Sequence, residues 1–498
     1  MKKNIAIWSI MFACFFVLAA CNEDQNEEQS NQENNHTNAE EAMETAIIEN
    51  VQESIDQYRE KDEIEDDETV EGLTEIVDTI EEADENDENE KVLASLKELR
   101  ETLNAQKDKD HLSDAAYESL HTDVRDLTGK HDEPAVVGYW EGEDELKLED
   151  VPAENLTHIN YAFANVEDDG TASIDSDSEK EVEKLNQYKK DHDHIETLIS
   201  IGGWGDNSKK FSDAAATPES REKFVQTTID TFIDESQFNG IDIDWEFPVR
   251  GGEDGMMNRV NDDENLTKLF EEFRKQLNQK EMEDKEEYLL TTATPAGRYQ
   301  NGGTYEPADS YEFDKIPEYL DWVQVMTYDL ANGFAPTTNH NAAMEAVDSD
   351  PTPEESKKWN NVSGAVEYYM NEGVPEDKIV LGTAFYGRSF EVSENDNDGL
   401  FQEFEEPGDN ADWRDIKNEY LKDSDWEEHW DSDAEVPWLF NEETNMFLTY
   451  DNPKSIEQKA KFIKDNDLRG GMIWSIGLDD KDHSLLDALA KPVLEEDN

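Results

Sequence analysis

Eight short β-rich runs alternate with helical patterns from Pro134 onward, and this alternation limits the fold more than any other feature. The runs are AVVGYW, HINYAFANV, IETLISIGG, GIDIDWEFP, YLLTTATPA, WVQVMTYDL, KIVLGTAFYG and GGMIWSIG. Amphipathic stretches such as SREKFVQTTIDTFIDES and ENLTKLFEEFRKQLNQK separate most of them. Eight strand–helix units in one domain predict an α/β fold, a (β/α)8 TIM barrel over residues 134–494. The main alternative is a doubly wound open sheet, but no run resembles its Gly-rich phosphate turn.

Acids and large apolar residues alternate strictly along the fourth run. The acids are Asp242, Asp244 and Glu246, and the apolar residues between them are Ile241, Ile243 and Trp245. Acids alone carry little weight, because 125 of 498 residues are Asp or Glu and this spacing should arise about eight times by chance. Side chains alternate between the two faces of a strand, so we expect these acids to face the barrel interior. A half-exposed strand with its acids in water is the alternative.

The position of Glu246 at the end of the fourth run indicates a catalytic site. Active sites of such barrels lie at the C-terminal ends of the strands, and Glu246 stands last, just before Pro248. Carboxylates this close together do not all ionise readily, so at least one pKa should rise. A general acid that works near neutral pH needs such a rise.

The same run resembles the D-x-x-D-x-D-x-E signature of glycoside hydrolase family 18, the chitinase family. SIGGW, VMTYDL, FYGRSF and GGMIWSIGLDD resemble the third, sixth, seventh and eighth strands of that family, so the resemblance extends from Pro134 to Val493. Two positions depart from the pattern: the first acid is Asn239, and Phe247 replaces a common Tyr. The resemblance implies chitin or N-acetylglucosamine oligosaccharides as substrate, with net retention and no cofactor.

The resemblance also implies catalytic roles. Glu246 would protonate the glycosidic oxygen, and the 2-acetamido carbonyl oxygen of the substrate would be the nucleophile, an exception to the use of two enzymic carboxylates. Asp244 would hold the acetamido group and exchange a proton with Asp242, while Tyr328 would hydrogen-bond its carbonyl oxygen. Trp474 would form an apolar floor beneath the sugar.

Further residues are expected to contact substrate. These are Trp474, Met326, Asp329, Gln324, Tyr139, Phe163, Phe247 and Arg388. Packing in the core is the alternative for the aromatic residues and for Met326, and pairing with one of the many acids is the alternative for Arg388. His residues are few and lack ligand spacing, so no catalytic metal is expected.

Between the seventh and eighth runs the chain is about 60 residues longer than one helix needs. In the family such a segment forms a small α+β insertion that deepens the substrate cleft, here over about residues 390–448. It holds Trp413, Trp426, Trp430 and Trp438, which could stack on sugars but are mainly expected to build its core. ENDNDGLFQEFE within it partly resembles a calcium loop, but acid-rich chains produce such matches freely.

The N-terminal third differs in composition. Residues 1–20 combine Lys2 and Lys3 with a short apolar run, and LAAC resembles a bacterial lipobox, which implies a signal peptide cleaved before a lipidated Cys21. An ordinary secretory signal is the alternative. Residues 21–38 are expected to be an acidic disordered tether, and residues 39–133 an acidic helical region or stalk. The barrel would then lie outside the cell, anchored to the membrane at Cys21 or secreted.

The net charge of −82, from 43 basic and 125 acidic residues, speaks against a nucleic-acid partner and favours a neutral substrate. Self-repulsion on this scale suggests a salt-loving source, because the Debye length falls to about 3 Å at 1 M salt. We therefore expect the melting temperature to rise between dilute buffer and molar chloride. A melting temperature that stays level or falls with added salt would contradict this.

Two other functions remain open at this point. The first is a non-catalytic sugar-binding protein on the same fold, whose usual mark, loss of the terminal Glu, is absent because Glu246 is present. The second is an endo-β-N-acetylglucosaminidase that acts on peptidoglycan or glycoprotein glycans. A monomer is expected in each case.

Overall fold

The computed structural model describes residues 48, 51–59, 61, 63–64, 67–84, 89–107, 109, 111–131, 134–142, 146–253, 255–284, 286–296 and 307–495. The chain separates into two compact units, Met1–His131 and Asp132–Asn498. The predicted signal peptide, Cys21 and the acidic tether lie outside the described residues.

The first unit is helical. A helical stretch over residues 51–59 precedes α2 (Asp67–Asp84), α3 (Asn89–Lys107) and α4 (Asp114–His131). The apolar positions that recur every three or four residues are buried, for example Ile55, Leu73, Leu96 and Leu120. The helical pattern of this region is thus present, and none of the helices described here or in the second unit is both long and apolar enough to cross a membrane.

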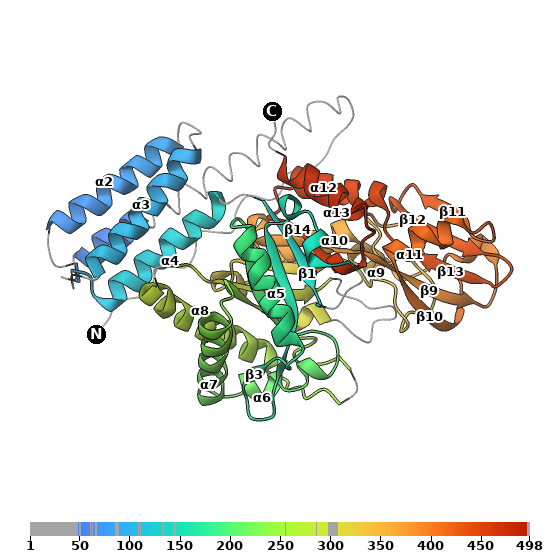
Figure 1. Cartoon of the computed structure of the whole chain (residues 1–498), viewed down its shortest axis with the longest axis horizontal. Helices are drawn as coiled ribbons and strands as arrows, with labels where there is room; N and C mark the ends of the chain where they lie inside the picture. The colour runs from blue at the N-terminus through green and yellow to red at the C-terminus, as the bar shows by residue number, and fades with distance from the viewer. Residues whose placement is uncertain are drawn as a thin grey trace, which may run out of the picture. The chain divides into compact units, whose positions relative to one another are not determined.

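The second unit contains the predicted barrel (Figure 1). Its strands are β1 (Ala135–Trp140), β2 (His158–Val166), β4 (Glu196–Gly202), β5 (Gly240–Asp244), β6 (Leu289–Pro295), β7 (Trp322–Met326), β8 (Ile379–Ala384) and β14 (Gly470–Trp474). Neighbours pair in parallel in the order β1-β14-β8-β7-β6-β5-β4-β2, and β1 also pairs with β2, which closes the sheet. A two-residue strand β3 (Ala172–Ser173) adds an antiparallel hairpin to β2. The eight parallel strands confirm the (β/α)8 prediction.

α-Helices follow most of the barrel strands. They are α5 (Ser178–Asp191), α6 (Phe211–Ala215), α7 (Pro218–Thr228), α8 (Asp262–Asp284), α9 (Glu354–Trp359), α10 (Val362–Asn371), α12 (Pro453–Asp465) and α13 (Ser484–Leu494). Local sequence explains where α7 begins: the Thr217 hydroxyl accepts from the Ser220 backbone N–H, and Pro218 follows at the first helical position. A π-helical segment, Ile229–Glu235, extends α7.

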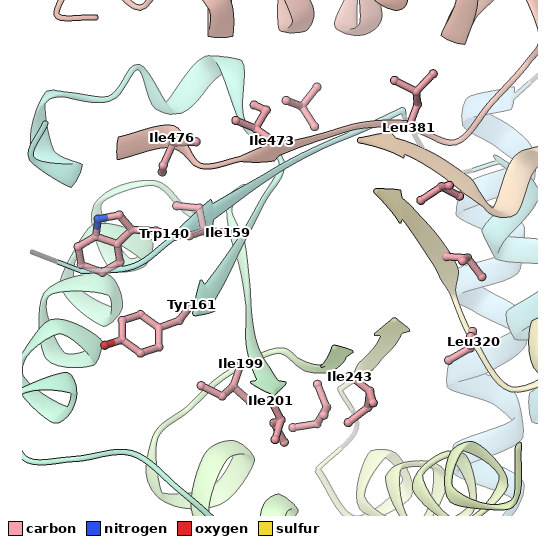
Figure 2. Close-up of a cluster of buried hydrophobic side chains, with 14 of the residues drawn as sticks. Trp140, Ile159, Tyr161, Ile199, Ile201, Ile243, Leu320, Leu381, Ile473 and Ile476 are labelled. Atoms are coloured by element: carbon pink, nitrogen blue, oxygen red, sulfur yellow. The ribbon is translucent and has the colours of Figure 1, made fainter. Parts of the chain in front are cut away.

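The apolar half of each strand packs against these helices. Ile241, Ile243 and Trp245 belong to one buried cluster with Phe211 of α6 and Phe273 of α8, and the rings of Trp245 and Phe211 stack with centroids 5.3 Å apart. Figure 2 shows the same cluster along other strands, including residues of β2, β4 and β14. The alternation in the fourth run therefore separates an outer apolar face from an inner polar face, as predicted.

An insertion lies between β8 and β14. Its five-stranded antiparallel sheet has the order β10-β9-β13-β12-β11. The strands are β9 (Tyr386–Val392), β10 (Phe404–Asp412), β11 (Glu427–Asp431), β12 (Val436–Asn441) and β13 (Met446–Thr449), with the short helix α11 (Trp413–Asn418) between β10 and β11. The insertion is thus the expected α+β element, and its first strand begins at Tyr386, a few residues before the predicted boundary.

Two of its four tryptophans are largely buried. Trp413 packs in the outer core of the barrel, and its indole N–H donates to Asp480 Oδ2 at 2.8 Å. Trp438 lies in the core of the insertion sheet. Trp430 is half-buried beneath the ammonium of Lys454, which lies 3.4 Å from its ring centroid. Of the four, only Trp438 lies in the core of the insertion, whereas Trp413 and Trp426 pack against the outer core of the barrel, so the expectation that most of them build the core of the insertion is wrong.

Candidate active site

The three acids of the fourth run lie where β5 ends. Asp242 and Asp244 point inward from the strand and are buried, with exposed fractions of 0% and 3%. The strand ends at Asp244 rather than at Pro248, so Glu246 stands in the loop beyond it and stays half-buried. The hydroxyl of Tyr311 donates to the Trp245 carbonyl at 3.0 Å and helps to hold this loop. The Glu246–Phe247 peptide is cis, as are Ala162–Phe163 within β2 and Trp474–Ser475 at the end of β14.

Four donors surround the carboxylate of Asp242. The hydroxyls of Tyr139 and Ser200 donate to Oδ2 at 2.7 and 2.6 Å. The Thr291 hydroxyl and the Gln324 amide nitrogen donate to Oδ1 at 2.7 and 2.8 Å. Burial raises the pKa of Asp242, while these four hydrogen bonds act in the opposite direction because they favour the ionised form. Asp242 is therefore the carboxylate best prepared to carry a negative charge.

Asp244 has a different environment. Its Oδ1 is buried and has no hydrogen-bond partner among the described residues. Burial, and then the charges of Glu246 and Asp242, raise its pKa well above the usual value. Four hydrogen bonds favour the ionised form of Asp242, whereas burial and two neighbouring charges oppose ionisation of Asp244, so Asp244 is the carboxyl of this pair that more readily keeps a proton. Asp244 thus presents an unsatisfied polar atom to the interior of the site.

Glu246 is suited to donate a proton near neutral pH. Burial, and then the charge of Asp329, raise its pKa to about 8. Its backbone N–H donates to the hydroxyl of Ser208 at 3.3 Å, which fixes the start of the loop. A carboxyl with this pKa is mainly protonated at pH 7, which is the state that a general acid requires.

Asp329 and Arg388 form an ion pair beside Glu246. The guanidinium of Arg388 donates through Nε and Nη2 to the two oxygens of Asp329, and the hydroxyl of Tyr386 donates to Asp329 Oδ1 at 2.6 Å. Asp329 has a left-handed backbone, with φ of 57°, a conformation that Asp adopts more readily than most residues. The structure therefore shows Arg388 paired with an acid, which is the alternative to substrate binding for this residue. A direct contact between Arg388 and substrate stays a prediction.

Tyr328 lies among these groups. Its hydroxyl is 3.8 Å from the sulfur of Met472, and its ring meets that of Tyr386 edge-on with centroids 6.4 Å apart. Burial, and then the nearby Tyr386, Asp244, Asp329 and Glu246, raise its pKa well above the usual value. The hydroxyl therefore keeps its proton and can donate it in a hydrogen bond.

Aromatic side chains form one wall of the inner cluster. The rings of Trp474 and Phe163 stack with centroids 5.4 Å apart and an interplanar angle of 18°, and Tyr139 lies 5.4 Å from Trp474. Met326 packs against the same cluster. Phe247 meets the half-exposed Trp204 at a centroid distance of 6.4 Å. Trp474, Phe163 and Met326 keep partial exposure, so their side chains are accessible to a ligand.

Two predicted substrate contacts have other partners in the structure. Gln324 is fully buried, and its amide nitrogen donates to Asp242 and to the Tyr139 hydroxyl, 3.1 Å away. Tyr139 is 1% exposed and donates to Asp242. Both residues thus support Asp242 from beneath, because they lie deeper in the barrel than the strand ends. The sequence-based prediction is a contact with substrate for both, with packing in the core as the alternative for Tyr139.

Several residues of the site were not singled out from the sequence. Ser200 and Thr291 bind Asp242, and Tyr386 binds Asp329. Ser200 and Tyr386 lie inside the runs SIGGW and FYGRSF, so their period-two position on the inner face was the available signal. Within the described residues no group of three or more His, Cys, Asp or Glu side chains is arranged to hold a metal ion.

Known proteins share this architecture. Chitinase A1 of Niallia circulans is 32% identical over 308 residues, which cover 60% of this chain and 42% of that protein. A solved structure of chitinase ChiA74 from Bacillus thuringiensis is 29% identical with a TM-score of 0.66, covering 74% of this chain and 71% of that one. A family 18 N-acetylglucosaminidase from Paenibacillus barengoltzii is 31% identical with a TM-score of 0.64, covering 72% of this chain and all of that one.

Family models divide the chain as the structure does. The helical residues 48–129 match the FIMAH domain. Residues 135–479, which are more than half of the chain and include the whole barrel site, match the model of glycosyl hydrolases family 18. With Asp242, Asp244 and Glu246 on the inner face of its fourth barrel strand and the loop that follows, the chain belongs to glycosyl hydrolases family 18.

Proposed function

We propose that this protein is a chitinase, which hydrolyses β-1,4 bonds between N-acetylglucosamine units with assistance from the substrate. The observation that carries the proposal is the buried Oδ1 of Asp244, which has no hydrogen-bond partner among the residues that the structure describes, beside Glu246 with its pKa of about 8. A buried acceptor without a partner is unfavourable unless a ligand satisfies it. The N–H of a 2-acetamido group is a donor of the right kind, and a sugar that lacks this group would leave the oxygen unsatisfied.

The first step follows from these positions. Glu246 donates its proton to the glycosidic oxygen as that bond breaks, and the acetamido carbonyl oxygen of the substrate forms a bond to the anomeric carbon. Asp244 accepts a hydrogen bond from the acetamido N–H, and Tyr328 donates one to the acetamido carbonyl. The resulting oxazolinium carries a positive charge, which a carboxylate at Asp244 stabilises. Water, deprotonated by Glu246, then opens the ring with net retention.

Asp244 needs its charge when the oxazolinium forms. It is protonated in the resting site, so it must release a proton at that moment. The ionised Asp242, held by four donors, is the neighbouring acceptor. Proton exchange between the two carboxyls keeps the total charge of the pair constant, which suits a buried site.

The remaining predicted residues fit supporting positions around the sugar. Trp474, stacked on Phe163, offers an apolar face for a pyranose ring, and Met326 lies in the same wall. The exposed Trp204, whose ring meets that of the buried Phe247 edge-on, offers a second aromatic surface. Asp329 and Arg388 act on Glu246 through charge.

The second candidate is an N-acetylglucosaminidase with a different glycan as substrate. It is retained because one similar structure is described as a family 18 N-acetylglucosaminidase. Both candidates use the acetamido group, so the site described above serves either one.

Product profiles decide between the candidates. The intact protein is incubated with chitin oligosaccharides, peptidoglycan and glycoprotein glycans, and the released sugars are identified by mass spectrometry. The proposal predicts that chitin oligosaccharides are cut with a kcat/KM far above that of the other two. Preferential release from peptidoglycan or glycoproteins would assign the second candidate, and binding without release would point to a sugar-binding protein.

Asp329→Asn is expected to move the alkaline limb of the kcat profile to lower pH. Glu246 acts as an acid below its pKa, which is about 8 because of burial and then the charge of Asp329. Removing that charge, and with it the partner of Arg388, lowers the pKa, so the proton is lost at lower pH. Asp348→Asn, an exposed acid on the same loop, is the control. A limb that is unchanged or moves upward contradicts the assigned cause.

We also propose that the enzyme is anchored outside the cell by a lipid on Cys21. The lipobox-like LAAC at residues 18–21 supports this. Labelled fatty acid should enter the protein expressed in a bacterial host, and the label should disappear in Cys21→Ser. Cys14→Ser is the matched control, because Cys14 lies within the segment that cleavage would remove. Labelling that survives Cys21→Ser contradicts the proposal.

A further inference from the structure

A polar layer crosses the barrel beneath the site. Six of its strands each contribute one side chain to it, and each of these is at most 1% exposed: Tyr139, Asn160, Ser200, Asp242, Thr291 and Gln324. Four of them donate directly to Asp242. Asn160, from β2, does not touch Asp242, and neither the sequence motifs nor the mechanism above uses it.

Asn160 contacts Gln324. Its amide nitrogen donates to Gln324 Oε1 at 3.4 Å. The other end of the Gln324 amide, Nε2, donates to Asp242 Oδ1 at 2.8 Å and to the Tyr139 hydroxyl at 3.1 Å. Both hydrogens of Gln324 Nε2 are thus donated, one to Asp242 and one to Tyr139. The carbonyl oxygen of Gln324 accepts from Asn160, so every polar atom of this amide has a partner.

The opposite orientation of the Gln324 amide is unfavourable for two reasons. It would bring Oε1 against the carboxylate of Asp242, so that two acceptors face each other unless Asp242 is protonated. With Asn160 oriented as it is in the structure, the opposite orientation would also bring Nε2 against the amide nitrogen of Asn160, so that two donors face each other. Mismatches of this kind are costly in a buried network.

We propose that Asn160 and Gln324 form a relay of positioning residues that keeps Asp242 ionised in the resting site, so that Asp242 can take the proton of Asp244 during the reaction. The proposal rests on the proposed function for its consequence in catalysis. The charge state of Asp242 itself follows from the hydrogen bonds and can be measured without substrate.

Two titratable groups face Asp242 among the residues that the structure describes. They are Tyr139 from β1 and Asp244 from β5. The other partners of Asp242, namely Ser200, Thr291 and Gln324, do not titrate. The pKa of Tyr139 is raised well above its usual value by burial and then by Asp242 and Asp244, so its hydroxyl remains a donor. The charge of Asp242 therefore depends on its hydrogen bonds and on the proton that it shares with Asp244.

The kinetic test uses Asn160→Leu, which keeps the approximate shape and removes the donor. Without Asn160 one of the two constraints on the orientation of the Gln324 amide is lost, so the amide turns more readily and its hydrogen bond to the charged form of Asp242 weakens. The acid limb of the kcat profile on chitin oligosaccharides should then move up by about one pH unit or more. Activity should recover at higher pH, where Asp242 ionises, and KM should change little. Thr292→Val is the control, since it removes an equally buried hydroxyl that donates to the Ile243 carbonyl instead.

A double variant separates positioning from stability. In Asn160→Leu/Gln324→Met no buried carbonyl is left without a donor, so the melting temperature should return toward that of the wild type. The acid limb should stay shifted, because the donor to Asp242 is still missing. Recovery of both the melting temperature and the wild-type pH profile would show that Asn160 only supports the fold, and would overturn the proposal.

An infrared measurement on the substrate-free enzyme gives the second readout. The spectrum of each protein is subtracted from that of the same protein carrying Asp242→Asn, at a pH just below neutral. The difference spectrum in the wild-type background should show the bands of an ionised carboxylate for Asp242. The difference spectrum in the Asn160→Leu background should instead show the C=O stretch of a protonated carboxyl. A protonated Asp242 in the wild type, or an ionised one in Asn160→Leu, would overturn the proposal. If the wild type cuts no chitin oligosaccharide, the proposed function fails, while this arm still decides the role of Asn160.

Discussion

Glu246→Gln is expected to lower kcat by roughly 10²- to 10⁴-fold, the contribution of a positioned general acid. Gln has nearly the shape of Glu but holds no transferable proton, so the leaving oxygen departs as an unprotonated alkoxide. Binding of oligosaccharide should persist, because the aromatic wall and Asp244 are unchanged. The measurement is kcat by steady-state kinetics and Kd by calorimetry on the same chitin oligosaccharide.

The pH profile gives this prediction a second readout. The wild-type alkaline limb should fall near pH 8, where Glu246 loses its proton. The residual activity of Glu246→Gln should lack that limb. Glu219→Gln, an exposed acid in the first turn of α7, is the matched control and should leave both quantities unchanged. A loss of kcat below tenfold would remove Glu246 from the role of acid.

Asp244→Asn should be nearly as severe, with kcat lower by roughly 10²- to 10³-fold, which is typical for the loss of one preorganised electrostatic group. The Asn oxygen can still accept from the acetamido N–H, so substrate binds. A neutral amide does not balance the charge of the oxazolinium, however, so the loss should fall on kcat rather than on KM.

The melting temperature of Asp244→Asn should not fall along with its kcat. Asp244 is buried, carries an oxygen without a partner among the described residues and has a pKa raised well above its usual value. Replacing it by a neutral side chain of the same size should leave the melting temperature unchanged or raise it. Asp263→Asn, a half-buried acid in the first turn of α8, is the control. A large fall in melting temperature together with kcat would mean that Asp244 mainly supports the fold.

The sequence predicts the barrel well because each strand carries its own signal. Period-two alternation of Ile241, Ile243 and Trp245 against acids is local, and the structure shows the same two faces. The end of β5 at Asp244 was less visible, since Glu246 continues the alternation although the chain has already left the sheet.

The contacts of the site depend on pairings between distant strands. Tyr139 and Asp242 are 103 residues apart, and Gln324 and Asp242 are 82 apart. Which inward side chains share a layer depends on the stagger of the closed sheet, and no local pattern encodes that stagger. For this reason Asp242 and Gln324 are predicted separately from the sequence, one as a catalytic residue and one as a substrate contact. Only the structure shows that Gln324 donates to Asp242 and that Arg388 pairs with Asp329.

The central claim is that the nucleophile is the acetamido oxygen of the substrate. The most direct measurement compares oligomers that differ only at this group, with intact-protein mass spectrometry in the presence of a 2-fluoro sugar. The account predicts that N-acetylated oligomers are cut, that fully deacetylated chitosan oligomers and cello-oligomers are inert, and that the protein gains no covalent sugar. A glycosyl adduct on Asp244 or Asp242, with hydrolysis of oligomers that carry glucose at the cleavage site, would contradict it.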